Sequence, residues 1–201
     1  MDYTIEDFFK YKQYLNTIDK VLQGYFEDQK EYIFCKKGCS KCCEEGQYRC
    51  TELEFKYMML GFFKLPFEEQ QRIAIRIKAL RKDYENCLDK KEFKYRCPFL
   101  DEKGFCPVYE YRGIICRTFG LITLSDDGNE CTIPFCYEYG LNYSNVYNSA
   151  TKKIDMDKVK ELGLNNIPYP RRTNLKTIMS PDFFEGEPLD FGKRKQLVEW
   201  L

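Results

Sequence analysis

Residues 34–43 read Phe34-Cys35-Lys36-Lys37-Gly38-Cys39-Ser40-Lys41-Cys42-Cys43. Such closely spaced thiols are typical of metal-binding loops, because thiolates are the soft ligands that zinc, iron and iron–sulfur clusters prefer. Two residues separate Cys39 from Cys42, so a short loop can direct both sulfurs at one point. Gly38 can supply the positive φ of a tight turn. The side chains of Cys42 and Cys43 diverge, so we expect either one ligand and one packing or redox thiol, or a loop that serves two metals.

The composition restricts the chemistry of the chain. It has 201 residues, with 11 cysteines and no histidine. Without histidine there is no Ser-His-Asp triad, no Cys-His pair and no imidazole ligand. Any metal site must therefore use cysteine, assisted by Asp, Glu or the backbone. No catalytic residue can be named, so whether the chain is an enzyme stays open at this point.

Charge and hydropathy indicate which partners to expect. The 32 basic and 32 acidic residues balance, which argues against nucleic acid as the main partner. No stretch approaches the ~18 apolar residues of a membrane span, so we expect no membrane partner. Residues 1–7 are acidic and polar and do not begin a signal peptide. We therefore expect a cytoplasmic protein, whose reduced cysteines favour metal binding over disulfides.

Hydrophobic periodicity predicts a mainly α-helical fold, because apolar residues recur at helical spacing over long stretches. The content of 43% hydrophobic residues is enough for a core. The predicted helices span 5–31, about 51–63 after a capping box at Thr51, about 67–90 after Pro66, 155–162 before Gly163, and 191–201. We expect one domain over 1–201, with an N-terminal helix (5–31), a cysteine core (about 34–136) and an extension (140–201). The proline-containing stretch 165–190 is expected to be irregular.

A second cysteine region runs from 97 to 136. Proline follows both Cys97 and Cys106, which favours extended backbone at each cysteine. Residues 101–104 predict a tight turn that would return Cys106 towards Cys97. Residues 119–124 and 130–135 predict one β-hairpin across Asp-Asp-Gly-Asn. The fold class is thus mainly α, with a small irregular, metal-supported α+β region that carries this hairpin.

These residues resemble the YkgJ-like cysteine-cluster family, a zinc- or iron-chelating domain named for its CxxCxxCC signature. The signature and the later motifs correspond here to Cys35, Cys39, Cys42 and Cys43, to Cys97-Pro98-Phe99-Leu100, to Gly104-Phe105-Cys106-Pro107-Val108-Tyr109, and to Arg112-Gly113-Ile114-Ile115-Cys116-Arg117-Thr118-Phe119. The resemblance covers about residues 34–136. It departs from the family in two places: the first gap is one residue longer, and Gly113 replaces the usual proline. The last family cysteine corresponds to Cys131 or Cys136.

The resemblance implies a metal-binding protein. Its candidate ligands are Cys35, Cys39, Cys42, Cys43, Cys97, Cys106, Cys116 and Cys136, with Cys131 as the alternative to the last. These thiols could fill two closed, structural four-thiolate zinc sites, or one [4Fe–4S] cluster with thiols to spare. A cluster would bring redox chemistry or substrate activation. Arg117 could donate hydrogen bonds to such a cofactor, or to a bound carboxylate.

Two alternatives accompany this interpretation. The family looks related to flagellin N-methylase, a protein-lysine methyltransferase, which would imply S-adenosylmethionine, an iron–sulfur cluster and a protein substrate. The chain shows no Gly-rich Rossmann turn, so an ordinary methyltransferase fold is disfavoured. The spacing Cys35-x3-Cys39-x2-Cys42 also matches radical S-adenosylmethionine enzymes, but the alternating strands and helices of their barrel are missing. A thiol-redox or metal-storage protein, in which Cys42 and Cys43 exchange with Cys50, is the third hypothesis.

Overall fold

The computed structural model describes residues 2–36, 38–124, 131–164 and 189–201. It divides into two compact units. Unit 1 comprises Met1–Phe9, Gly38–Arg117 and Asp190–Leu201, and unit 2 comprises Lys10–Lys37 and Thr118–Leu189. The described residues are mainly helical, which confirms the predicted fold class. The single domain stays a prediction, because compact units defined by contacts do not show what folds independently.

Helices account for most of the regular structure. They are α1 (Ile5–Asp28), α2 (Lys41–Glu44), α3 (Glu52–Phe63), α4 (Phe67–Asn86), α5 (Ile114–Thr118) and α6 (Met156–Glu161), with 3-10 turns η1 (Lys30–Tyr32), η2 (Tyr109–Tyr111), η3 (Phe135–Tyr139) and η5 (Leu197–Glu199). The strands form antiparallel pairs: β1 (Arg49–Thr51) with β6 (Arg194–Gln196), β2 (Thr123–Leu124) with β3 (Cys131–Thr132), and β4 (Tyr147–Asn148) with β5 (Lys153–Ile154).

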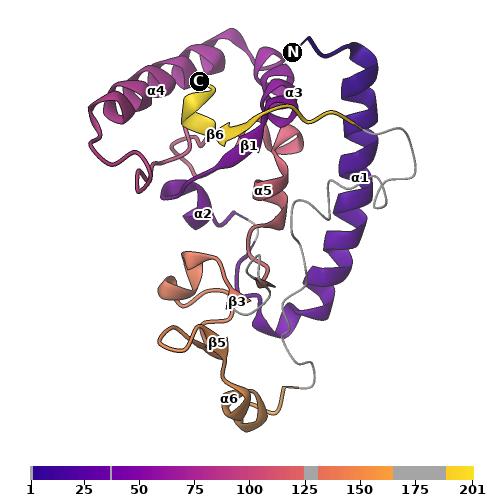
Figure 1. Cartoon of the computed structure of the whole chain (residues 1–201), viewed down its shortest axis with the longest axis vertical. Coiled ribbons are helices and arrows are strands. Elements are labelled where there is room, and N and C mark those ends of the chain that lie inside the picture. Colours follow the sequence, from indigo (N-terminus) through magenta and orange to yellow (C-terminus); the bar gives the residue numbers. More distant parts are fainter. Residues whose placement is uncertain (1, 37, 125–130, 165–188) are drawn as a thin grey trace. The chain divides into compact units, whose positions relative to one another are not determined.

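Local signals explain the two main helices of unit 1, α3 and α4 (Figure 1). α3 begins with the predicted capping box. The Thr51 hydroxyl accepts the N–H of Glu54 at 3.3 Å, and the Glu54 carboxylate accepts the N–H of Thr51 at 2.7 Å. α4 follows Pro66, as predicted, but ends at Asn86 rather than near residue 90. Cys87 has extended backbone angles, which terminate the helix.

The predicted helix over 191–201 is wrong. Residues 194–196 instead form β6, which pairs with β1 so that Cys50 lies opposite Lys195, and a single 3-10 turn follows. Gly192 has a φ of +67°, a left-handed conformation that an α-helix excludes. The strand also gives the N–H and C=O groups of β1 their partners, which a helix at this place would leave unpaired.

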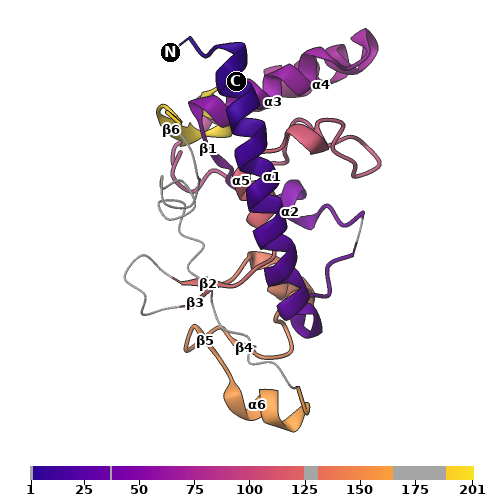
Figure 2. The same cartoon turned by 90° about the vertical axis from the view of Figure 1, so that its right-hand side faces the viewer.

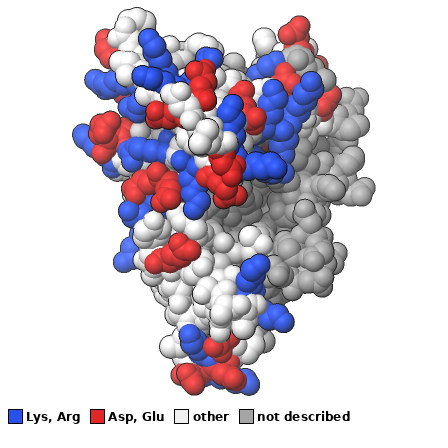
Figure 3. Space-filling model, turned by 60° about the vertical axis from the view of Figure 1, so that its left-hand side comes forward, with Lys and Arg blue, Asp and Glu red and all other residues white. Residues whose placement is uncertain are grey.

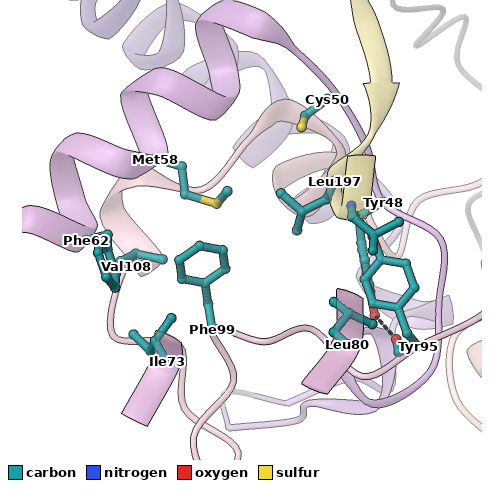
Figure 4. Packing of buried hydrophobic residues seen from close by; sticks show 11 residues of the cluster. Tyr48, Cys50, Met58, Phe62, Ile73, Leu80, Tyr95, Phe99, Val108 and Leu197 are labelled. Atoms are coloured by element: carbon teal, nitrogen blue, oxygen red, sulfur yellow. Dashed lines mark hydrogen bonds between the residues drawn. The ribbon is translucent and has the colours of Figure 1, made fainter. Parts of the chain in front are cut away.

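The core of unit 1 lies among α3, α4, the cysteine segments and the C-terminal residues (Figure 4). Its buried members are Tyr48, Cys50, Met58, Phe62, Ile73, Leu80, Tyr95, Phe99, Val108, Leu197 and Val198. Phe99 has no exposed surface, and its ring lies edge-on to Phe62 with 6.4 Å between centroids. Phe99 and Val108 each follow a cysteine by two residues, so the core holds the backbone beside Cys97 and Cys106.

Most of α1 belongs to unit 2, and its buried face is Tyr11, Tyr14, Leu15, Ile18 and Leu22. The helix starts at the predicted cap, where the Thr4 hydroxyl accepts the N–H of Asp7 at 3.2 Å. It ends at Asp28, three residues earlier than predicted. Ile5 and Phe9, which fit the helical stripe in the sequence, are 90% and 61% exposed. The first turns of α1 therefore do not contribute these two residues to a core.

The remainder of unit 2 consists of short elements, which Figure 2 shows in sequence order as β2–β3, β4–β5 and α6. A small core gathers Tyr32, Ile122, Tyr143, Val146 and Val159. The predicted hairpin is confirmed as β2–β3, with two residues in each strand. The predicted short helix is confirmed as α6, and it ends before Gly163 at a φ of +62°. The stretch 165–188 of the expected irregular segment lies outside the described residues.

The surface carries both signs of charge. On the face in Figure 3, Lys and Arg are interspersed with Asp and Glu. Two of the pairs within single helices are Lys41 with Glu44 at 2.7 Å and Arg72 with Glu69 at 2.9 Å. Within the part of the chain that the structure describes, no helix has the length and apolar character needed to cross a membrane.

Candidate metal centre

The structure distributes the predicted ligands over both units. Unit 1 contains Cys39, Cys42, Cys43, Cys97, Cys106 and Cys116, and unit 2 contains Cys35 and Cys136. In unit 2, the N–H of Cys35 donates to the Asn142 side chain at 2.9 Å, and Cys136 is buried. The side chain of Cys131 lies outside the described residues. The two sets therefore belong to different compact units.

Backbone hydrogen bonds hold Cys43 beside Cys97. The N–H of Cys97 donates to the carbonyl of Cys43 at 2.8 Å. Three residues further along the first segment, Gly46 and Tyr95 exchange two hydrogen bonds of 3.2 and 3.0 Å in an antiparallel bridge. The end of α2 and the segment leading to Cys97 thus run together like a short strand pair, which fixes both cysteine backbones.

The predicted tight turn returns the chain from Cys97 to Cys106. The N–H of Asp101 donates to the carbonyl of Phe105 at 2.8 Å, and the Asp101 carboxylate accepts the N–H groups of Lys103 and Phe105, both at 2.8 Å. Gly104 supplies a φ of +83°, which favours glycine because it carries no Cβ. This turn is encoded locally, and its prediction is confirmed.

Cys116 is supplied by α5, a helix of five residues. The N–H of its first residue, Ile114, donates to the buried Glu54 carboxylate at 2.8 Å. The N–H of Cys116 itself donates to the carbonyl of Gly113 at 3.1 Å. Contact with α3, through Glu54, therefore helps to place this thiol.

Four thiols of unit 1 are linked through their pKa values. We call Cys43, Cys97, Cys106 and Cys116 the thiol quartet. Burial raises the pKa of Cys97, and the charges of Cys43 and Cys106 raise it further. Burial also raises the pKa of Cys106, to about 11, with a smaller contribution from Cys43. The pKa of Cys116 is raised first by burial and then by Cys97, Cys43 and Cys106.

For Cys116, the exposed surface of the residue and the cause of its raised pKa disagree. Its side chain has exposed surface, whereas desolvation is the largest cause of its raised pKa. Three neighbouring thiols act on the pKa of Cys116 in the same sense as burial, so it is raised. Thiolates this close would repel one another, and protonation or a bound cation relieves that repulsion.

Cys43 differs from the other members of the quartet because its pKa is lowered. The largest cause is its hydrogen bond with Cys42, whose sulfur lies 3.8 Å away; burial opposes the shift and the Arg96 charge assists it. Cys43 is therefore the thiol of the quartet that ionises most easily. The predicted divergence of the two side chains is wrong, because their sulfurs lie 3.8 Å apart. Which of them is a ligand stays a prediction.

Three residues beside the quartet were not predicted as part of the site. The buried Tyr48 hydroxyl donates to the carbonyl of Cys42 at 2.8 Å, and burial followed by the charges of nearby thiols raises its pKa. Arg96 lowers the pKa of Cys43, and Arg112 lowers that of Cys106. Arg96 adjoins Cys97 in the sequence and could have been found there. Arg112 stands in the same sequence motif as Cys116, whereas no sequence signal identifies Tyr48 as a neighbour of the thiols.

The predicted cofactor-binding residue Arg117 is buried, and its guanidinium donates hydrogen bonds to backbone carbonyls. It donates to the carbonyl of Arg112 at 3.1 Å and to that of Glu110 at 2.9 Å. These bonds join α5 to η2, the turn that precedes it. A role of Arg117 towards a cofactor stays a prediction.

The quartet has the donor chemistry of a metal site but not its closed geometry. In the described ranges, no three Cys, Asp or Glu side chains are placed so that together they could hold a metal ion. Four soft sulfur donors nevertheless match what zinc and iron require.

Comparisons with known proteins do not identify a family. No protein-family model, no curated protein and no solved structure matches this chain. The likeness to the YkgJ-like family therefore stays a prediction based on the cysteine motifs, as does the relation to flagellin N-methylase.

Proposed function

We propose that this chain is a metal-binding protein, and that the thiol quartet holds zinc or iron, the latter as an ion or as a [4Fe–4S] cluster. One observation supports the proposal above the others. The N–H of Cys97 donates to the carbonyl of Cys43 at 2.8 Å, and burial together with the charges of Cys43 and Cys106 raises the pKa of Cys97. Cys35, Cys39, Cys42 and Cys136 remain candidate ligands beyond the quartet.

A bound metal would supply a cross-link between segments that are otherwise short and irregular. Four thiolates on zinc make a closed, structural site, and four thiolates also hold a [4Fe–4S] cluster. In both cases the ligated centre is anionic, and the guanidinium groups of Arg96 and Arg112 offset part of that charge. The proposal requires reduced cysteines, which fits a compartment such as the cytoplasm.

The raised thiol pKa values predict a steep pH dependence of metal binding. Protons and metal compete for the same sulfurs, and near neutral pH Cys97, Cys106 and Cys116 are protonated without metal because their pKa values are raised. Raising the pH removes this competition, so the affinity for Zn²⁺ increases. Each thiol that loses its proton on binding contributes about tenfold per pH unit. Competition titrations between pH 6 and 8, with proton release measured in weak buffer, would show a flat profile if thiols were not the ligands.

Metal and acid-labile sulfide analysis of anaerobically purified protein, with its visible spectrum, tests the proposal. Iron with sulfide and broad visible absorption is the result expected for a cluster. Colourless protein with zinc in a fixed ratio, released only on unfolding, is the result expected for a structural ion. Protein without metal, purified with its thiols protected and unable to bind added Zn²⁺ or Fe²⁺, would overturn the proposal.

A further inference from the structure

The buried carboxylate of Glu54 accepts two separate backbone hydrogen bonds. Glu54 is only 3% exposed. One oxygen accepts the N–H of Thr51 at 2.7 Å and closes the capping box of α3. The other accepts the N–H of Ile114 at 2.8 Å, at the start of α5. The capping box needs only the first bond, so the second is an additional link between two elements that are 60 residues apart.

The second bond holds the helix that carries a member of the thiol quartet. α5 has five residues, and a helix this short is not stable by itself. The backbone next to it approaches Glu54 closely, since a Cβ added to Gly113 would lie 3.1 Å from the same carboxylate oxygen. Glu54 also lies near enough to Cys116 for its charge to act on that thiol.

We propose that Glu54 is a positioning residue for the metal ligand Cys116, which it orients through its hydrogen bond to the start of α5. This inference rests on the proposed metal-binding function. Groups that orient a metal ligand commonly change metal affinity about 10–100-fold when they are replaced. Here the orientation acts through the backbone of α5, and no contact between Glu54 and the metal is required.

The chemistry of the two bonds requires a carboxylate. Both partners are backbone N–H donors, so both oxygens of Glu54 must accept. A glutamine has nearly the same shape, but its amide nitrogen is a donor and cannot accept a hydrogen bond. Glu54→Gln therefore loses one of the two links while it preserves volume.

The test compares Glu54→Gln with Thr51→Ala in the full-length protein. Thr51→Ala removes the hydroxyl of the capping box but keeps both bonds of the Glu54 carboxylate. It therefore perturbs the start of α3 without releasing α5. Zn²⁺ release to a chromogenic chelator and the spectrum of the Co²⁺-loaded protein are measured for both variants and the wild type, together with urea unfolding.

We expect Glu54→Gln to release Zn²⁺ about 10–100 times faster than the wild type and to weaken the sulfur-to-cobalt charge-transfer band, because Cys116 is then held less well in its orientation towards the ion. We expect Thr51→Ala to release Zn²⁺ within about threefold of the wild-type rate, with an unchanged band. Equal release from Glu54→Gln and the wild type would overturn the inference. Equal acceleration by both variants would also overturn it, since the effect would then come from α3 stability.

A second variant covers the case in which Glu54→Gln does not fold. Gly113→Ala keeps the carboxylate but places a Cβ 3.1 Å from the oxygen that accepts from Ile114, which requires this oxygen to give by a few tenths of an ångström. We expect this variant to release Zn²⁺ severalfold faster, and wild-type release would contradict the inference. Failure of the wild type itself to bind Co²⁺ or Zn²⁺ would instead refute the proposed function, so the two failures are distinguishable.

Discussion

Replacing Cys97 with serine is expected to lower the affinity for Zn²⁺ at least about a hundredfold, or about 2.8 kcal/mol. The reason is that a serine hydroxyl is a harder and much less acidic donor than a thiol, so a four-thiolate site loses one ligand. Cys106→Ser and Cys116→Ser are expected to act alike, because their thiols interact with Cys97 and with one another. Competition titration with a chelator of known affinity measures the loss.

Cys87→Ser is the matched control for these variants. Cys87 ends α4, and its thiol donates to the carbonyl of Asp89 at 3.3 Å, a bond that a serine hydroxyl can also make. The affinity of the Cys87→Ser variant for Zn²⁺ is expected to stay at the wild-type value. Comparison of Cys42→Ser with Cys43→Ser then decides which neighbour is the ligand. Wild-type affinity in all three quartet variants would contradict the proposed site.

The parts of the fold that could be predicted are those in which nearby residues supply the hydrogen bonds. The capping box of Thr51 and Glu54 is complete within four residues. The turn at Asp101 is likewise built from the side chain and backbone of its own segment. For such elements the amino-acid sequence contains the whole physical reason, so pattern and structure agree.

The errors lie where a distant partner or an unusual turn determines the structure. β6 exists because it pairs with β1, more than 140 residues earlier in the sequence, and its own residues do not reveal this partner. The hairpin β4–β5 was not predicted because its turn lacks the usual glycine. The Asn148 side chain accepts two backbone N–H groups there, and Lys152 adopts a φ of +53°.

The candidate site shows the same division. Residue type and spacing suffice to make the cysteines candidate ligands, because sulfur chemistry is a property of the residue itself. The groups that surround them depend on tertiary contacts. Glu54 carries a capping signal in the sequence, yet its bond to Ile114 is visible only once α3 and α5 are in place. Tyr48 similarly reaches the quartet through packing against Tyr95, with 5.3 Å between ring centroids.

Phe99→Ala is expected to lower the free energy of unfolding by about 3–5 kcal/mol, the usual cost of deleting a fully buried aromatic side chain. Phe99 has no exposed surface and packs against Phe62 in the core of unit 1 (Figure 4). The substitution leaves a cavity two residues after Cys97, beside the backbone that positions this thiol. Urea unfolding of metal-free protein, analysed by linear extrapolation, measures the loss.

Phe105→Ala provides the control within the same loop. Phe105 is 59% exposed, so its removal is expected to change the free energy of unfolding by no more than about 0.5 kcal/mol.

Zn²⁺ should recover part of the stability that Phe99→Ala loses, because an ion that binds only the folded chain stabilises it by about 2.7 kcal/mol at a hundred times its dissociation constant. The recovery would be smaller than in the wild type, since the cavity also loosens Cys97. If Zn²⁺ stabilised Phe99→Ala and the wild type by the same amount, the core and the thiol quartet would be energetically independent.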